Sequence, residues 1–243
     1  MAASATSGHH QNRLLAAIPQ DVYTLLAPDL KETVIKQGEI LQEGGDTVDR
    51  VYFPQSGMIS LLVVTKDGGA IEAATIGREG AAGLQRGLGK RKAFTRAVIQ
   101  VGGRFSHMPA ERFEKAASKS EAIRNIIANY MEVLWMEAQQ IAACNAIHSA
   151  EQRLGRWLLQ TRDRIESDTL PLTQEFLSQM LGVRRTTVTL VAQTLQAAGL
   201  INYHRGKIAI VDGEGLLKAT CECYAATHHK TLPNKIGVKL GGA

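Results

Sequence analysis

The sequence predicts an α+β fold in which a small β-roll (jelly roll) comes first, one long helix follows, and a compact helical domain ends the chain. Short apolar runs separated by glycines fill residues 30–109, a texture typical of small barrels and rolls. From Glu121 onward, apolar residues recur at helical spacing for more than twenty positions. Residues 172–210 then hold two short helical patterns around Gly182 and an alternating run.

The composition limits the function classes. A chain of 243 residues is long enough for two modest domains with separate cores. Its formal net charge of +5 suits a polyanionic partner, although many soluble proteins are mildly basic. The three cysteines form neither an even disulfide framework nor a CxxC pair, which fits a reducing compartment. Because residues 1–11 lack a signal-peptide core and no apolar run is long enough to span a membrane, we expect a cytoplasmic protein without a membrane partner.

The first half of the chain divides into an arm and a roll. Residues 1–29 predict an N-terminal arm with one short helix over 14–26, in which Pro19 lies near a break and after which Pro28 marks the exit. Residues 30–115 predict the β-roll, with a helical turn over 109–115. Its strands are expected at 33–35, 39–41, 51–53, 58–64, 70–76 and 97–101.

Residues 116–147 predict a dimerisation helix. Its apolar stripe follows a four-three-four-four-three spacing, which suits a parallel partner helix. The residues of this stripe are Ile123, Ile127, Tyr130, Leu134, Ala138 and Ile141. The alternative is that the stripe packs against the β-roll of a monomer. Its length favours a homodimer.

Residues 148–215 predict a winged helix-turn-helix. Thr173 can cap a first helix with its hydroxyl, and Gly182 permits the chain to reverse. A second helix starts at Arg184 and stops before Gly199. Residues 201–210 then alternate as a hairpin with cations at its tip. In such a domain the second helix enters the major groove of double-stranded DNA.

The predicted DNA contacts lie at the start of the first helix, in the first half of the second, and at the hairpin tip. They are Thr173, Gln174, Arg184, Arg185, Thr186, Thr187, Thr189, Arg205 and Lys207. Guanidinium groups can bind guanine O6 and N7, and a helix N-terminus attracts phosphate. Any single arginine here could equally be a solvated surface residue. The ordered set of cap, glycine turn, double arginine and basic hairpin favours DNA binding.

Residues 172–188 and 199–208 resemble the winged helix-turn-helix of the CRP/FNR family of bacterial transcription regulators, and 38–44 and 51–57 resemble its early strands. The resemblance extends over about residues 20–215. It implies a cyclic-nucleotide-binding-like β-roll, a dimer helix and a palindromic operator, with RNA polymerase as a further candidate partner.

The resemblance also assigns roles to single residues. Arg185 falls on the family's first base-reading arginine, whereas Thr186 replaces its glutamate and Leu190 its second arginine. Thr173 and His204 match phosphate-contacting positions. We therefore expect an operator unlike those of the best-known members.

The cyclic-nucleotide motifs of the family are changed. Leu84 stands where the ribose-binding glutamate is expected, and the phosphate-binding motif falls near residues 92–94, without its arginine. Because a buried phosphate would then lack charge pairing, we expect no cAMP binding. The basic run 90–92 is either a substitute or a solvated loop. The alternative that the roll binds an unknown small-molecule effector stays open.

We predict no metal and no cofactor. An iron-sulfur cluster of the family's N-terminal type needs cysteines that this chain lacks before Cys144. Cys144 is a candidate thiol switch, while Cys221 and Cys223 lie in the C-terminal segment. The histidines considered as metal ligands lack a third ligand nearby in the sequence. They are His9, His10, His107, His148, His228 and His229.

These patterns predict a homodimeric, sequence-specific transcription regulator, controlled either by an effector or by its abundance. The alternative is a sensing or nucleotide-binding signalling module whose C-terminal domain contacts protein. No nucleophile elbow, phosphate loop or zinc-protease motif indicates an enzyme. Residues 216–243 predict a C-terminal helix through 223–224 and a tail.

Overall fold

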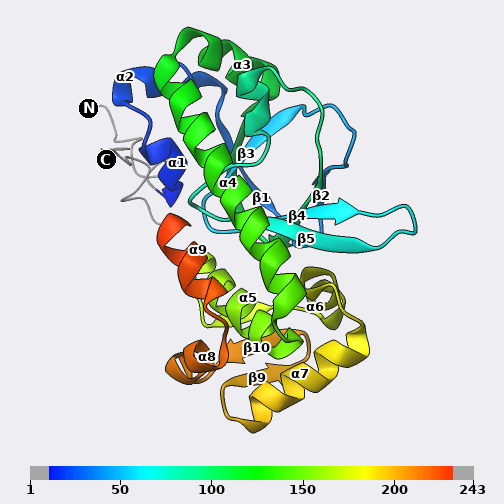
Figure 1. Cartoon of the computed structure of the whole chain (residues 1–243). Coiled ribbons are helices and arrows are strands. Elements are labelled where there is room, and N and C mark those ends of the chain that lie inside the picture. Colours follow the sequence, from blue (N-terminus) through cyan, green and yellow to red (C-terminus); the bar gives the residue numbers. More distant parts are fainter. Residues whose placement is uncertain (1–10, 232–243) are drawn as a thin grey trace, which may run out of the picture.

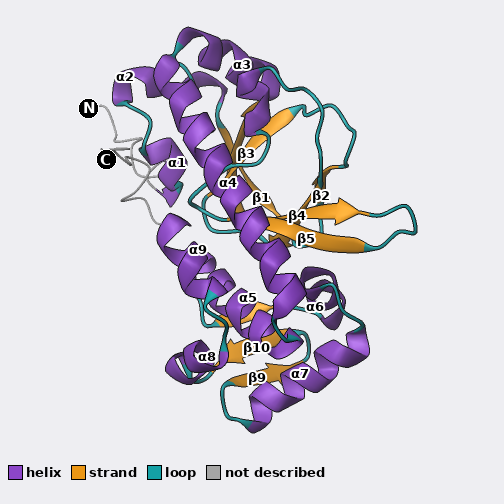
Figure 2. Ribbon diagram, in the orientation of Figure 1, coloured by secondary structure: helices purple, strands orange, loops and turns teal. Residues whose placement is uncertain are grey.

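A computed structural model describes residues 11–231 of the chain. A β-roll and a C-terminal domain lie at opposite ends, and one long helix runs past the roll to the C-terminal domain (Figure 1). The order of strands and helices agrees with the predicted α+β class (Figure 2).

The roll consists of two antiparallel sheets, one in the order β1-β7-β3 and one in the order β2-β6-β4-β5. Their strands are β1 (Lys31–Ile35), β2 (Ile40–Gln42), β3 (Arg50–Pro54), β4 (Met58–Val64), β5 (Ala70–Ile76), β6 (Arg96–Val101) and β7 (Gly103–Pro109). Each of the six predicted runs overlaps one strand. The sequence analysis missed β7, the central strand of its sheet, because it buries only Phe105, Ser106 and Met108 and has a weak apolar pattern.

The segment predicted as one helix over 14–26 is divided at Pro19, where a break was expected. The segment forms two short helices, α1 (Arg13–Ala16) and α2 (Gln20–Tyr23), and a 3-10 turn η2 (Ala27–Asp29). Pro19 separates α1 from α2, since proline has no backbone N–H to continue a helix. The side-chain amide of Asn12 donates to the carbonyls of Pro54 and Gly80, each at 2.9 Å, and so attaches the segment to the roll.

Helix α3 (Ala110–Lys119) crosses the predicted border at 115, so the roll extends further than expected. It packs against the 3-10 turn η3 (Leu84–Leu88). Helix α4 (Glu121–Ile147) follows directly, with the hydroxyl of Ser120 accepting the backbone N–H of Ile123. Its 27 residues correspond to a rod of about 40 Å.

The predicted dimer stripe on α4 is wrong for four of its six residues. Ile123, Ile127, Tyr130 and Ile141 are each at most 4% exposed within the single chain. The first three belong to the core of the roll, so they cannot face a partner helix. These three residues are instead buried against the roll, which is the alternative given by the sequence. Leu134 and Ala138 remain partly exposed.

A different face of α4 is exposed. Its residues recur at three-four spacing over the length of the helix, and Trp135 at their centre is 65% exposed. We call it the α4 outer face, and its residues are Asn125, Ala128, Glu132, Trp135, Gln139, Ala142 and Ala146. Apolar residues at three-four spacing form the seam of a two-stranded coiled coil, and on this face Ala128, Trp135 and Ala142 alternate with polar Asn125, Glu132 and Gln139.

The C-terminal domain contains the expected helix pair and hairpin. Its elements are α5 (Ala150–Ile165), β8 (Thr169–Pro171), α6 (Gln174–Leu181), α7 (Arg185–Ala197), β9 (Ile201–His204), β10 (Lys207–Ile210), α8 (Gly213–Ala219) and α9 (Cys223–Thr231). The short strand β8 was not predicted; it pairs with β10 on the side opposite β9. The border predicted at 215 falls inside α8, which packs on α5, and the single predicted C-terminal helix is instead the pair α8 and α9.

The two domains share a continuous core. Met58 and Leu62 of the roll pack in one cluster with Trp157, Leu177 and Met180 of the C-terminal domain. Within residues 11–231, none of the helices has the length and apolar character needed to cross a bilayer.

A buried ionic network also crosses this domain interface. Arg164 of α5 places its Nε 2.9 Å from Oε1 of Glu79, which follows β5. Its Nη2 lies 3.1 Å from Oε1 of Glu137 on α4. All three side chains are buried. The network therefore connects the roll, the long helix and the C-terminal domain at one point.

Candidate nucleic-acid interface

The turn between α6 and α7 has the local chemistry expected from the sequence. The hydroxyl of Thr173 accepts the backbone N–H of Phe176 at 3.3 Å and caps α6, as predicted. Gly182 ends α6 with φ of 61°, a left-handed conformation that glycine adopts without strain. Leu177, Val188 and Leu195 are buried and hold the two helices together. The angle between α6 and α7 is therefore set by a packed apolar contact.

The hairpin of β9 and β10 forms the wing. Arg205 and Gly206 make its two-residue turn, with φ of 47° and 74°, the signature of a type I′ turn. The backbone N–H of Leu172 donates to the carbonyl of Gly206 at 2.8 Å, which holds the wing tip beside the start of α6. Within β9, the N–H of Tyr203 donates to Gln196 Oε1 of α7 at 2.8 Å and attaches the wing to that helix.

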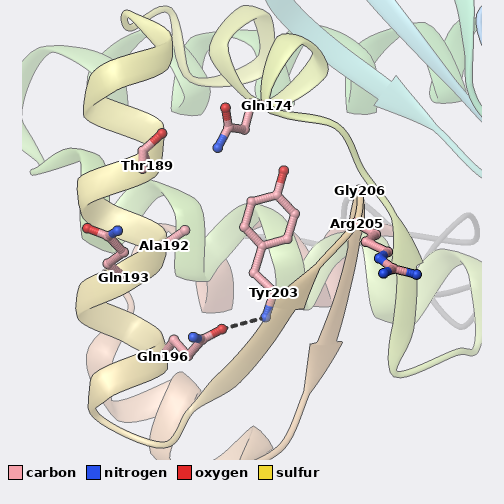
Figure 3. A pocket seen from close by; sticks show the side chains of 8 residues that line it. All are labelled: Gln174, Thr189, Ala192, Gln193, Gln196, Tyr203, Arg205 and Gly206. Carbon is pink, nitrogen blue, oxygen red and sulfur yellow. Dashed lines mark hydrogen bonds between the residues drawn. The ribbon is translucent and has the colours of Figure 1, made fainter.

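Between α6, α7 and the wing lies a groove of about 470 Å³ (Figure 3). Its lining residues are Gln174, Thr189, Ala192, Gln193, Gln196, Tyr203, Arg205 and Gly206. The structure thus brings together Gln174, Thr189 and Arg205, which were predicted from three separate segments. Sequence reasoning missed Gln193 and Gln196, although they follow Thr189 at helical spacing of four and then three residues.

The other predicted contacts lie around this groove. Arg184 precedes α7 as its N-cap residue instead of forming part of the helix, and Arg185 begins it. The exposed residues of the predicted set are Thr173, Arg184, Arg185, Thr186, His204, Arg205 and Lys207, whereas Gln174, Thr187 and Thr189 are half-buried.

Two intramolecular contacts define the chemistry of α7. Arg185 forms an ion pair with Glu175 in the first turn of α6, and both side chains are well exposed. An exposed ion pair of this kind is weak, so a nucleic acid can displace the carboxylate. The hydroxyl of Thr189 donates to the carbonyl of Arg185 at 3.1 Å. Because its proton is used there, this hydroxyl faces the groove mainly as a hydrogen-bond acceptor.

A second cavity, of about 430 Å³, lies between the roll and α4. Leu84 and Phe94, the positions of the altered nucleotide motifs, both line it, together with Met131, Leu134 and Trp135 of α4. Among the described residues around this cavity, none is charged, and the polar side chains are those of two glutamines and a threonine. The basic run 90–92 is solvent-exposed and does not line the cavity.

The histidine and cysteine predictions need correction. His148 lies beside all three cysteines, so the expectation that it lacks nearby ligands is wrong. The sequence signal was a cysteine four residues before a histidine, with a CxC pair far along the chain. His107 on β7 instead hydrogen-bonds Arg50 at 3.0 Å. His9 and His10, and the side chains of His228 and His229, lie outside the described part of the structure.

Comparison with known proteins agrees with this geometry. Residues 152–219 match the Crp-like helix-turn-helix domain. The fold is similar to that of FixK2 from Bradyrhizobium japonicum, with a TM-score of 0.68 at 15% identity over 79% of this chain and 98% of that one. It is also similar to a CRP/FNR-family transcriptional regulator from Eubacterium rectale, with a TM-score of 0.67 at 20% identity over 86% and 98% of the two chains.

The chain has the fold of CRP/FNR-type regulators, and its residues 152–219 match the Crp-like helix-turn-helix domain. A further relative, the global nitrogen regulator of Nostoc sp., is 23% identical to this chain over 210 residues, which cover 82% of this chain and 93% of the relative. The resemblance noted in the sequence is thereby confirmed for the fold and for the helix-turn-helix domain, and the roll has the fold of the cyclic-nucleotide-binding domain found in such proteins.

Proposed function

We propose that this regulator binds a palindromic DNA operator as a homodimer, with α7 in the major groove and the wing on the backbone. The observation that carries the proposal is the groove in which Thr189, Gln193 and Arg205 meet, with Arg185 at its helix start. A helix presenting a guanidinium, a hydroxyl and an amide one turn apart offers the side-chain types that read base edges.

The contacts divide into base readers and phosphate contacts. Arg185 is proposed to bind guanine after leaving Glu175, and Gln193 to bind adenine. Leu190 is exposed on α7 and is suited to a thymine methyl group. Phosphates are assigned to Thr173, Gln174, Arg184, Thr186, Thr187, His204, Arg205 and Lys207, which position the domain without reading sequence.

The proposed dimer contact is the α4 outer face and not the buried stripe. Trp135 supplies a large apolar side chain, and Ala128, Ala142 and Ala146 permit close approach of a second helix. Two residues of the predicted stripe, Leu134 and Ala138, are partly exposed, and we place them at the edge of this dimer contact. A parallel pair of such helices relates two DNA-reading domains by a two-fold axis, which matches a palindrome.

The regulator is proposed to act without cAMP. A cyclic phosphate needs a paired cation when it is buried, and the described lining of the roll cavity carries no charge. The cavity instead fits an apolar effector. We further propose that the protein works in the cytoplasm, where it meets chromosomal DNA and RNA polymerase, and that it is a regulator and not an enzyme.

The test is selection of bound sequences from a random duplex pool by the purified regulator, without ligand and then with cAMP. An enriched palindrome without ligand supports the proposal. Enrichment that requires cAMP would overturn the cavity argument, and enrichment in neither condition would favour the protein-contacting alternative. Arg185→Ala and Arg205→Ala should weaken binding to the selected site. Arg91→Ala, which removes an equally exposed charge from the roll, is the matched control.

A further inference from the structure

All three cysteines of the chain and one histidine meet at the junction between the long helix and the C-terminal domain. Cys144 lies in the last turn of α4 and His148 ends that helix, while Cys221 and Cys223 lie between α8 and the first turn of α9. The ligand atoms of these four residues all lie within 4.8 Å of one another. The three cysteines are buried.

The distances within the cluster fit one tetrahedral metal ion. Cys144 Sγ lies 3.6 Å from Cys221 Sγ, and Cys223 Sγ lies 3.5 Å from His148 Nδ1. A tetrahedral zinc ion with Zn–S near 2.3 Å and Zn–N near 2.0 Å separates two sulfurs by about 3.8 Å, and a sulfur from a nitrogen by about 3.5 Å. Both observed separations agree with the edges of such a tetrahedron.

We propose that Cys144, His148, Cys221 and Cys223 bind a single Zn²⁺ ion. Three thiolates and one imidazole are the Cys₃His set of closed structural zinc sites, and soft sulfur ligands disfavour magnesium or calcium. Four protein ligands leave no open position for water, so the ion has a structural role and no catalytic one.

The surroundings of the cluster support bound metal. His148 Nε2 lies 3.2 Å from Glu222 Oε1, an arrangement that orients the ring and leaves Nδ1 to face the thiols. The amide of Gln140 donates to Cys223 Sγ at 3.1 Å, which stabilises a thiolate. Zinc with three thiolates carries a net charge of −1. Arg153, whose guanidinium donates at 3.1 Å to Oδ1 of Asn145, the residue directly after Cys144 in the sequence, places a positive charge near the site.

The cluster lies where the long helix α4 meets the start of α9, so a bound ion would connect these two segments. Cys144 and His148 belong to the helix that lies against the roll, and Cys221 and Cys223 hold the start of α9, which packs beside α4. One ion therefore joins two segments that are more than seventy residues apart in the sequence. Its removal should loosen the C-terminal domain from the long helix and lower the melting temperature.

The proposal is tested by the metal content of the purified full-length chain, measured by plasma mass spectrometry. We expect one zinc per chain, and loss of zinc in Cys144→Ser, Cys221→Ser, Cys223→Ser and His148→Gln. His107→Gln is the matched control, because His107 lies on β7 away from the cluster, and it should keep its zinc.

A measurement on the unaltered chain keeps the test valid if a variant does not fold. Chelator-treated protein is titrated with Co²⁺, and one equivalent should produce tetrahedral d–d bands and thiolate charge-transfer absorption that Zn²⁺ then removes. Absence of these bands, iron with inorganic sulfide in place of zinc, or a Cys144–Cys221 disulfide in freshly purified protein would each overturn the assignment. Because none of these readouts involves DNA, the result is independent of the proposed operator binding.

Discussion

The indole Nε1 of Trp157 donates a 2.8 Å hydrogen bond to Glu72 Oε1, and so a buried carboxylate of the roll holds the first helix of the DNA-reading domain. The hydroxyl of Ser60 donates to the other oxygen at 2.6 Å. Burial raises the pKa of Glu72 to about 7 despite both hydrogen bonds and the nearby charge of Arg156. The contact between the domains therefore includes a group that titrates near neutrality.

The first prediction concerns stability against pH. The pKa of Glu72 is raised from 4.5 to about 7 on folding, so below pH 4.5 this carboxyl is protonated in both states. Between pH 4.5 and 7 only the folded state holds the proton, and the free energy of unfolding falls by up to about 3 kcal/mol as the pH rises. Above pH 7 no further loss comes from this group.

Glu72→Gln should reduce that fall, because the amide is neutral at every pH and can still accept from Trp157. The measurement is urea unfolding at pH 5 and pH 8. The exposed Glu32→Gln is the control and should follow the parent chain. Burial also raises the pKa of Glu137, so the free energy of unfolding of the parent chain and of Glu72→Gln both fall further as the pH rises. The difference between these two proteins therefore reports on Glu72 alone. An equal fall in Glu72→Gln and parent would contradict the prediction.

The second prediction concerns the buried ion network. Arg164→Met leaves Glu79 and Glu137 without their shared cation, and removal of one partner from a buried pair costs about 3–5 kcal/mol. Arg162→Met, two residues earlier on α5, removes a half-exposed pair with Asp163 and should cost less than about 1 kcal/mol. Chemical unfolding of both variants checks the difference, and similar losses would show that the network contributes little.

The third prediction concerns the α4 outer face. Trp135→Glu should weaken the dimer by about 2 kcal/mol or more, roughly thirtyfold in dissociation constant, because a buried tryptophan is a typical interface anchor. Leu88→Glu changes an exposed apolar residue on η3 and is the control. Sedimentation velocity over a concentration series measures the effect. A Trp135→Glu protein that dimerises like the control would exclude this face.

The fourth prediction concerns the pair of Arg185 and Glu175. Arg185→Ala should lower affinity for the selected operator by about 1–3 kcal/mol and relax specificity at one base pair. Glu175→Gln should instead raise affinity slightly, because Arg185 no longer leaves an ion pair when it binds DNA. Fluorescence anisotropy with matched and single-mismatch duplexes measures both effects. Lower affinity in Glu175→Gln would indicate that the ion pair orients the arginine productively.

Features whose physical cause is local can be read from the amino-acid sequence. Strands over 58–64 and 70–76 follow from short apolar runs between glycines, and their predicted bounds agree with β4 and β5. The cap at Thr173 and the left-handed turn at Gly182 depend on single side chains and on backbone sterics, which a sequence displays directly.

Which face of α4 is buried, and which distant segments meet, depends instead on how the elements pack together. An apolar stripe specifies burial but not its partner, so Ile123 and Ile127 indicated a second helix although they contact the roll. The weakly patterned β7 and the short β8 form because neighbouring strands need hydrogen-bond partners. The meeting of Cys144 and His148 with Cys221 results from the docking of α9 on α4, a contact between residues distant in the chain that no local pattern encodes.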